Sequence, residues 1–236
     1  MQAEALSHTG LVRPGNEDCF IMDISEGLFA VADGMGGHQA GEVASHLALR
    51  ALRDRLFNGT AGEPLPRLLA AAAFANATVY HSSLASQERA GMGTTMTAVW
   101  IVGPKGFLVH VGDSRAYLFR DGQLQILTND HSYVGELVRR GGLTVEEARQ
   151  HPQRNILTRA LGTEDTVNID SREIKLQPGD RLLLCTDGLY EVIPDGELAA
   201  IINHHREPAP AARELVRVAL ERGGPDNITV VLVLYE

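Results

Sequence analysis

The sequence predicts an α+β fold in which helices pack on antiparallel sheet. Short apolar runs recur along the chain, and several are separated by turns of hairpin length, such as Gly103-Pro104 and Asp121-Gly122. Helical periodicity is confined to separate stretches, so strands and helices do not alternate as they do in a βαβ repeat. The expected strands are residues 19–24, 28–32, 96–102, 106–111, 116–120, 123–127, 181–185 and 228–235.

Three stretches predict helices that cover the sheets. Apolar residues recur at helical spacing between residues 43 and 56, and an alanine-rich helix is expected at about residues 64–83. A third apolar stripe runs from Ala212 to Leu220 and is followed by Gly223-Gly224, a pair typical of a helix C-cap.

The pattern changes between Asp130 and Gly162, where the chain becomes more polar. Residues 132–140 and 145–150 predict two short helices, and Thr144 with Glu147 forms the signature of a capping box. Because this segment interrupts the run of strands, we interpret it as an insertion that lies over a site.

Length and composition predict a single globular domain over residues 1–236. The chain is 44% hydrophobic and 22% charged, and no linker or repeat divides it. Its 21 basic and 30 acidic residues give a net charge of −9, which argues against binding to nucleic acid and to an anionic membrane surface.

No apolar run approaches the roughly 18 residues of a membrane span, and the first ten residues do not resemble a secretory signal. Cys19 and Cys185 lack metal-ligand spacing, so we expect buried thiols and a cytoplasmic location.

Acidic residues stand at the edges of otherwise apolar strands. One such residue is usually a turn or cap residue, but several together repel one another unless a cation compensates their charge. Oxygen ligands without nearby cysteine or histidine favour Mg²⁺ or Mn²⁺ over Zn²⁺. A carboxylate-rich site of this kind holds two ions and a shared water, and Arg13 would bind the remaining phosphate oxygens. The pattern thus predicts metal-assisted hydrolysis of phosphate esters. The acidic positions are Glu17-Asp18, Asp33, Asp113, Asp187 and Asp226.

The glycines at positions 34, 36 and 37 invite comparison with a dinucleotide-binding loop. The third glycine of that motif would fall at position 39, which is Gln39, and Asp33 directly before the loop would repel a pyrophosphate. We therefore interpret the glycines as residues that let the backbone approach a metal, with the Gly34 carbonyl as a candidate ligand.

Seven ordered motifs closely resemble the bacterial metal-dependent Ser/Thr protein phosphatases of the PPM, or type 2C, family, and the resemblance covers essentially the whole chain. It implies a four-layer αββα sandwich, in which helices flank two antiparallel sheets. The motifs are RPGNED (13–18), VADGMGGHQAGE (31–42), GMGTTMTAVWI (91–101), GDSRAYLFRDG (112–122), NILTRALG (155–162), LLLCTDGLYEVI (182–193) and GGPDNITVVLV (223–233).

The resemblance implies two Mn²⁺ or Mg²⁺ ions in the active site. Asp33 would bridge them, the Gly34 carbonyl would bind one, and Asp187 and Asp226 would bind the other. Bacterial members often hold a weaker third ion, for which Asp113 and Asp187 are the matching pair.

Other motif residues would support these ligands. By resemblance, Arg13 binds the substrate phosphate, while Glu17 and Asp18 hold metal-bound waters, either as ligands or from outside the first coordination sphere. The Thr94 hydroxyl either holds such groups in place or only suits a strand. Asn227 either orients the preceding aspartate or shapes the turn.

The general acid is the open assignment. Many eukaryotic members have a histidine where this chain has Met35, and the histidine here is His38. His38 either contacts substrate and donates a proton to the leaving alkoxide or caps the following helix. The segment 132–153 matches the family's flap, which affects substrate choice and turnover.

The expected function is that of a protein phosphatase acting on phosphoserine and phosphothreonine, by attack of a water held between the two ions. The expected partners are phosphoproteins and a Ser/Thr kinase that the enzyme opposes, and we expect a monomer. Two alternatives remain at this point. One is a hydrolase of small phosphometabolites or phosphotyrosine, and the other is a non-catalytic scaffold that binds a phosphoprotein.

Overall fold

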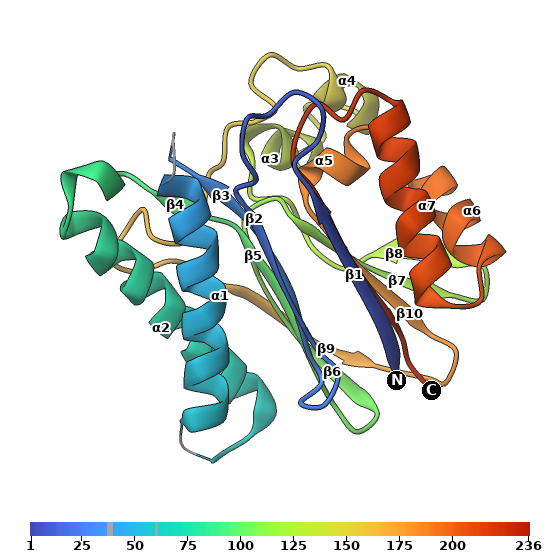
Figure 1. Cartoon of the computed structure of the whole chain (residues 1–236), viewed down its shortest axis with the longest axis horizontal. Helices are drawn as coiled ribbons and strands as arrows, with labels where there is room; N and C mark the ends of the chain where they lie inside the picture. The colour runs from blue at the N-terminus through green and yellow to red at the C-terminus, as the bar shows by residue number, and fades with distance from the viewer. Residues whose placement is uncertain (37–39, 60) are drawn as a thin grey trace.

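Two antiparallel sheets stack face to face in the computed structural model of the chain, and helices cover both outer faces (Figure 1). The structure describes residues 1–36, 40–59 and 61–236. The predicted α+β class and the four-layer order are confirmed.

The first sheet has five strands in the order β1-β11-β10-β7-β8. Each neighbouring pair is antiparallel, and β1 pairs with β11 although the two lie at opposite ends of the sequence. The strands are β1 (Gln2–His8), β7 (Arg115–Arg120), β8 (Gln123–Ile126), β10 (Arg181–Cys185) and β11 (Ile228–Leu234).

The second sheet follows the order β2-β3-β5-β6-β9, with the short β4 paired to β3. These pairs are antiparallel as well. The strands are β2 (Asp18–Asp23), β3 (Leu28–Met35), β4 (Gly93–Thr94), β5 (Met96–Val102), β6 (Lys105–Val111) and β9 (Asp170–Lys175).

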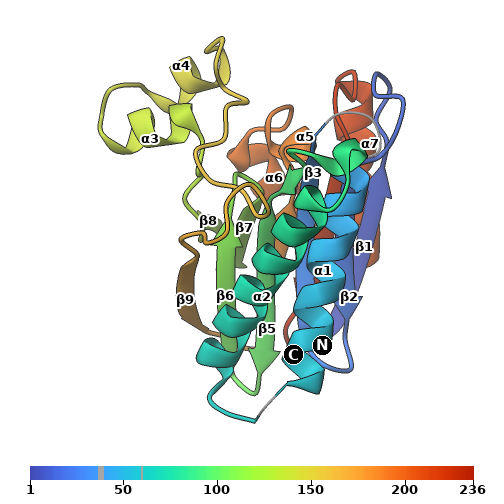
Figure 2. The ribbon, with the colours of Figure 1, turned by 90° about the vertical axis from the view of Figure 1, so that its left-hand side faces the viewer.

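Two layers of helices enclose the sheets. Helices α1 and α2 lie on the second sheet, and α6 and α7 lie on the first (Figures 1 and 2). Helix α7 ends as predicted, because Gly223 adopts a φ of 103° and the Gly224 N–H bonds the Ala219 carbonyl at 3.1 Å. The helices are α1 (Ala40–Asn58), α2 (Pro64–Leu84), α3 (Tyr133–Arg139), α4 (Val145–Arg149), α5 (Asp187–Tyr190), α6 (Asp195–His204) and α7 (Pro208–Glu221), with a 3₁₀ turn at Gln87–Arg89.

The core has three apolar layers, one between the sheets and one under each helical layer. Phe29 and Val31 face the other sheet, whereas Leu28 and Ala30 face α1 and α2. Successive residues of a strand point to opposite faces, so a central strand buried on both sides is apolar throughout. This is why β3 shows no polar alternation until it reaches Asp33.

The predicted flap consists of α3 and α4, which project beyond one end of the sandwich (Figure 2). Ser132 caps α3 by accepting the Gly135 N–H at 3.2 Å. The capping box of α4 is present, with the Thr144 hydroxyl accepting the Glu147 N–H and the Glu147 carboxylate accepting the Thr144 N–H.

Strands β1 and β9 and helix α6 are absent from the sequence prediction. β1 carries small residues, of which Ala3 and Ala5 contact the layer between the sheets, and Ile174 is the buried residue of the otherwise polar β9. Both are edge strands, so pairing to a neighbour decides their conformation more than their own composition does. The prediction for β3 also ended too early, because the strand continues to Met35 and contains Asp33.

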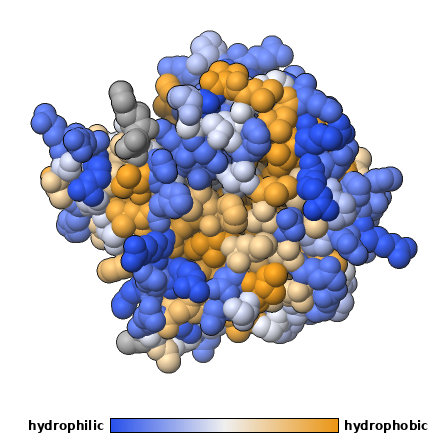
Figure 3. Space-filling view, viewed as in Figure 1, coloured by the Kyte–Doolittle hydropathy of each residue, from blue (hydrophilic) through white to orange (hydrophobic). Residues whose placement is uncertain are grey.

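The edge strands β1 and β2 meet on one open side of the sandwich. Phe20 and Met22 of β2 are more than a third exposed there, and apolar side chains gather along the middle of this face (Figure 3). Among the described residues, no helix has the length and apolarity required to span a bilayer.

Candidate active site

The second sheet brings acidic side chains to the end of the sandwich from which the flap projects. Asp18 begins β2 and lies opposite Asp33 of β3 in the strand register. Asp113 follows the end of β6, which runs in the same direction as β3 because β5 is antiparallel to both. Three carboxylates therefore come from neighbouring strand ends.

The first sheet contributes two more carboxylates at the same end. Asp187 lies two residues after β10, at the first position of α5, and Asp226 lies two residues before β11. Because β10 and β11 are antiparallel, the end of one strand meets the beginning of the other.

These side chains raise one another's pKa. Burial is the largest cause and neighbouring carboxylates the next, and together they raise the pKa of Asp33 and Asp187 well above the usual range. Burial also raises the pKa of Asp18 and of Asp113 to about 7. Ionised carboxylates at this end thus repel one another and lack the solvation of a surface.

Two of their oxygens have no hydrogen-bond partner within the described part of the chain. These are Oδ1 of Asp18 and Oδ1 of Asp187, and both atoms are buried. Buried polar atoms are normally paired, so orphaned oxygens on repelling carboxylates fit a site that receives cations.

The described residues do not include a group of three or more donors already arranged around one ion position. The donors that the described residues bring to this end are carboxylate oxygens, which favour hard cations such as Mg²⁺ or Mn²⁺.

Arg13 reaches this end from the loop that follows β1. Its Nη2 lies 2.6 Å from Oδ2 of Asp226, and its side chain remains 52% exposed. The bond to Asp226 is the main cause that raises the pKa of Arg13. An exposed guanidinium beside a carboxylate cluster is placed to meet an anion arriving from solvent.

The backbone around Asp33 is held by hydroxyl groups. The Thr94 hydroxyl donates to the Asp33 carbonyl at 2.8 Å, and the Asp33 N–H donates to Oγ1 of Thr95 at 2.8 Å. A Cβ on Gly34 would approach the Gly41 carbonyl oxygen to 2.1 Å, so position 34 has no room for a side chain. Thr94 thus contacts the backbone of the site and does more than fill a strand.

Glu17 and Asn227 connect the loop that carries Arg13 to the rest of the site. The Glu17 N–H donates to Oδ1 of Asn227 at 2.8 Å, and the Asn227 amide donates to the carbonyls of Thr9 and Gly15. The Asn227 backbone N–H, in turn, donates to Oδ1 of Asp226 at 2.9 Å. The Asn227 side chain therefore ties three segments of the turn together, whereas the contact with the Asp226 carboxylate comes from the Asn227 backbone.

Thr186 and Tyr190 join the site without having been predicted. The Thr186 hydroxyl donates to Oδ2 of Asp18 at 2.8 Å, and the Tyr190 hydroxyl donates to the Asp113 carbonyl at 3.0 Å. In the sequence, Thr186 directly precedes Asp187 and Tyr190 follows it by three residues. This proximity to a predicted ligand is the signal that could have placed both residues near the site. His38, the predicted general acid, lies outside the described residues.

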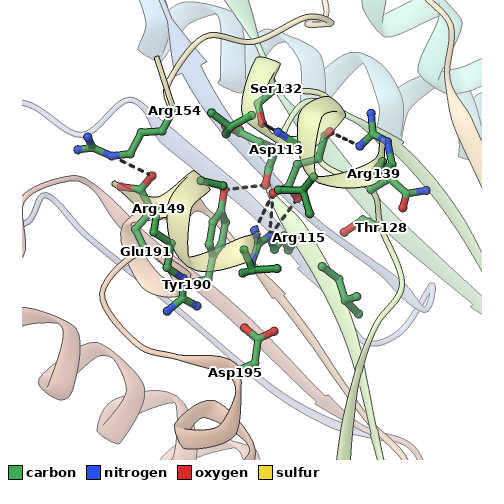
Figure 4. A pocket seen from close by; sticks show the side chains of 18 residues that line it. Asp113, Arg115, Thr128, Ser132, Arg139, Arg149, Arg154, Tyr190, Glu191 and Asp195 are labelled. Carbon is green, nitrogen blue, oxygen red and sulfur yellow. Dashed lines mark hydrogen bonds and ion pairs between the residues drawn. The ribbon is translucent and has the colours of Figure 1, made fainter. Parts of the chain in front are cut away.

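A cavity of about 250 Å³ separates the flap from the body of the molecule and reaches Asp113 (Figure 4). Apolar residues of α3 and α4 face a floor on which Arg115 stacks on the Tyr190 ring at 3.6 Å. Arg115 also pairs with Asp130 at 2.6 Å, so it is an ion-pair partner inside the fold.

Carboxylates from both sheets and the exposed guanidinium of Arg13 thus meet at one end of a two-sheet sandwich. The family model described as "Protein phosphatase 2C" matches residues 5–228. The chain belongs to the protein phosphatase 2C family. This confirms the family predicted from the seven motifs.

Individual relatives agree with this family. The chain is 43% identical over 229 residues to the serine/threonine protein phosphatase PstP of Mycobacterium tuberculosis, covering 97% of this chain and 44% of PstP. It is 39% identical to the serine/threonine phosphatase stp of Listeria monocytogenes, covering 99% of this chain and 95% of that protein. A crystal structure of the PstP catalytic domain with two manganese ions superposes with a TM-score of 0.87 at 40% identity, covering 98% and 96% of the two chains. The chain thus spans less than half of PstP and nearly all of the Listeria protein.

Proposed function

We propose that this chain is a single-domain protein phosphatase that hydrolyses phosphoserine and phosphothreonine in proteins, using two Mn²⁺ or Mg²⁺ ions. The observation that carries the proposal is the convergence of carboxylates from both sheets, with buried oxygens of Asp18 and Asp187 that lack partners among the described residues. The two manganese ions named for the PstP catalytic domain support the choice of metal.

The proposed ligands come from both sheets. Asp33 would bridge the ions, with the Gly34 carbonyl on one and Asp187 and Asp226 on the other. Asp113 and Asp187 would hold a weaker third ion, and Asp18 would face the ions through Oδ1, which has no partner among the described residues. When bound, the ions would activate a water as the nucleophile and neutralise the charge of the phosphate.

The side chains of this chain would position the substrate. Arg13 would bind the equatorial phosphate oxygens, because its exposed guanidinium already faces Asp226 and keeps N–H groups directed to solvent. Glu17 would support the site from the loop that it shares with Arg13, and its backbone carbonyl accepts the Gly34 N–H at 3.1 Å. Proton donation to the leaving oxygen is assigned to His38 from its place in the sequence.

The proposal extends to the setting of the enzyme. Phosphoproteins made by a Ser/Thr kinase are the proposed substrates, and the related phosphatases of Mycobacterium and Listeria support this substrate class. A cytoplasmic monomer with a net charge of −9 is the proposed form.

The direct test is phosphate release from a phosphothreonine peptide with Mn²⁺, with Mg²⁺ and with excess EDTA. Turnover that requires metal and stops in EDTA supports the proposal, and activity that survives EDTA contradicts it. Parallel assays with phosphotyrosine peptides and small phosphometabolites separate a protein phosphatase from the alternative hydrolases. A folded protein that binds a phosphopeptide without turnover supports the scaffold alternative.

A further inference from the structure

The turn that carries Asp113 is held by three neighbouring groups. Gly112 has a φ of 105° and packs closely on Thr95. A Cβ added to Gly112 would lie 2.5 Å from Cγ2 of Thr95. Ser114 shares a hydrogen bond of 2.7 Å with the Thr95 hydroxyl, and Tyr190 donates to the Asp113 carbonyl. The third group is His131, which is 1% exposed and lies just before the flap.

His131 binds Gly112 at two points. Its backbone N–H donates to the Gly112 carbonyl at 2.7 Å, and its ring Nδ1 accepts the Gly112 N–H at 3.2 Å. A backbone N–H is always a donor, so Nδ1 is the unprotonated nitrogen of the ring. The ring proton is therefore on Nε2, which lies 3.2 Å from Oδ2 of Asp170.

The opposite side of the ring is fixed as well. Nη1 of Arg159 donates to Oδ1 of Asp170 at 3.0 Å and lies 3.3 Å from Nε2 of His131, so this arginine holds the Asp170 carboxylate beside the imidazole. Burial lowers the pKa of His131, in agreement with a neutral ring that accepts at one nitrogen and donates at the other. This carboxylate–imidazole–backbone chain resembles the outer-shell arrangement that orients metal ligands in proteins.

The same residue belongs to the neck of the flap, which we define as residues 131–133 and 156–158. The His131 carbonyl accepts the Thr158 N–H at 2.8 Å, and the Tyr133 N–H donates to the Ile156 carbonyl at 2.8 Å. A β-bridge between Ser132 and Leu157 completes this pairing. The two ends of the flap therefore meet at His131, where the neck contacts the Asp113 turn.

We propose that His131 is a positioning residue, which fixes Asp113 for cation binding by holding the Gly112–Ser114 turn against the neck of the flap. The inference rests on the proposed function only in taking Asp113 as a cation ligand. His131 does not need to touch substrate or ion. It acts through the Gly112 amide, and Asp170 and Arg159 keep its ring in place.

The test compares two substitutions of His131 that differ in one atom's role. His131→Leu removes the acceptor at the Nδ1 position, whereas His131→Asn places an amide oxygen near that position and retains it. Asp180→Asn is the control, since Asp180 is also buried but pairs with Arg120 at the far end of the sandwich. Each protein is measured by amide exchange of Gly112 in NMR and by calorimetric titration with Mn²⁺.

His131→Leu should speed exchange of the Gly112 amide at least about tenfold. It should also raise the Kd of the weakest Mn²⁺ site about 10- to 100-fold, the range for residues that orient a metal ligand. His131→Asn should stay within about threefold of wild type in both measurements, and Asp180→Asn, which lowers the stability of the whole fold, should leave the Mn²⁺ titration unchanged. The KM for a phosphopeptide at saturating Mn²⁺ should not change in any of them.

Equal effects of His131→Leu and His131→Asn, or an unchanged Mn²⁺ titration in His131→Leu, would overturn the proposal. If His131→Leu does not fold, Asp170→Asn takes its place, and it should weaken the same Mn²⁺ event in the same direction; no shift contradicts the assignment. Amide exchange and metal titration do not depend on turnover, so a protein without phosphatase activity would refute the proposed function and still test His131.

Discussion

Two buried aspartates at opposite ends of the sandwich have opposite surroundings. Asp180, 2% exposed, receives two bonds from Arg120 at 2.7 and 2.5 Å and the Gln177 N–H at 2.8 Å. Asp18, 5% exposed, accepts the Thr186 hydroxyl, while its Oδ1 has no partner among the described residues. Among the described residues, Arg120 neutralises the Asp180 carboxylate, and no cationic side chain forms an ion pair with Asp18.

Under the proposed function, this difference separates a structural carboxylate from one that faces the cations. When an arginine forms two hydrogen bonds with a buried carboxylate, the two charges compensate each other. Removing either partner leaves the other with an uncompensated buried charge, which destabilises the fold. A buried carboxylate that faces other carboxylates weakens the fold until a cation arrives. Under the proposed function, the Asp18 end of the molecule binds cations at a cost in stability, and the Asp180 end does not.

The largest expected effect is that of Asp187→Asn. Asp187 has a buried oxygen without a described partner and is repelled by Asp113 and Asp226. Its loss should lower kcat at least about a hundredfold, the scale of losing a group that stabilises developing charge. The metal-free protein should be no less stable than wild type, because one repelling carboxylate is gone. Peptide turnover and urea denaturation in EDTA measure the two effects, and a clear loss of metal-free stability would remove the contrast.

Asp180→Asn should have the reverse pattern. It leaves Arg120 beside a neutral amide, and the free energy of unfolding should fall by about 2–3 kcal/mol, toward the low end for a buried pair because Arg120 is 30% exposed. Turnover at saturating Mn²⁺ should equal that of wild type. A fall in turnover without a fall in stability would show that the far end also serves the reaction.

Arg13→Ala sharpens the comparison, because Arg13 and Arg120 both pair with an aspartate. In the pair of Arg13 with Asp226 the arginine is 52% and the aspartate 27% exposed, so loss of the pair should change the free energy of unfolding by less than about 1 kcal/mol. Without its charge-assisted bonds to phosphate, KM should rise at least about tenfold. Steady-state kinetics on a phosphopeptide measure this, and kinetics like those of wild type would refute the assignment of Arg13.

The smallest expected effect concerns the flap. Thr144→Ala removes the hydroxyl that caps α4 and leaves the Glu147 carboxylate with the Thr144 backbone N–H alone. Exchange of the α4 amides should be about fivefold faster, as expected for a lost N-cap. Hydrogen exchange by mass spectrometry measures it, with the α7 amides as the internal control. Unchanged exchange in α4 would mean that packing rather than the cap holds this helix.

The sequence was sufficient to predict the acidic end, because each aspartate follows or precedes an apolar strand. Asp33, Asp113 and Asp187 are recognisable from that pattern alone, and antiparallel pairing then brings them together. The same is true of the flap helices, since the capping box at Thr144 and Glu147 is local.

Contacts between distant segments were beyond such prediction. Thr186 bonds Asp18 across 168 residues, and β1 pairs with β11 from the opposite end of the sequence. The role of His131 depends on Gly112, 19 residues earlier, meeting it in space. No local pattern encodes these pairings, which the packing of the two sheets creates.

The most direct test of the central contrast is chemical denaturation of the wild type with and without Mn²⁺ at pH 6 and pH 8. Burial raises the pKa of Asp18 and Asp113 to about 7, above the value of about 4 for an unfolded aspartate. Their contribution to metal-free stability therefore falls as pH rises from about 4 to 7 and is gone above 7, so the protein in EDTA should be less stable at pH 8 than at pH 6. Mn²⁺ at a hundredfold excess over its Kd at pH 8 should add about 3 kcal/mol at pH 8, and the same Mn²⁺ concentration should add less at pH 6. Stability that does not respond to Mn²⁺, or that rises with pH in EDTA, would contradict the claim that this end of the molecule is completed by cations.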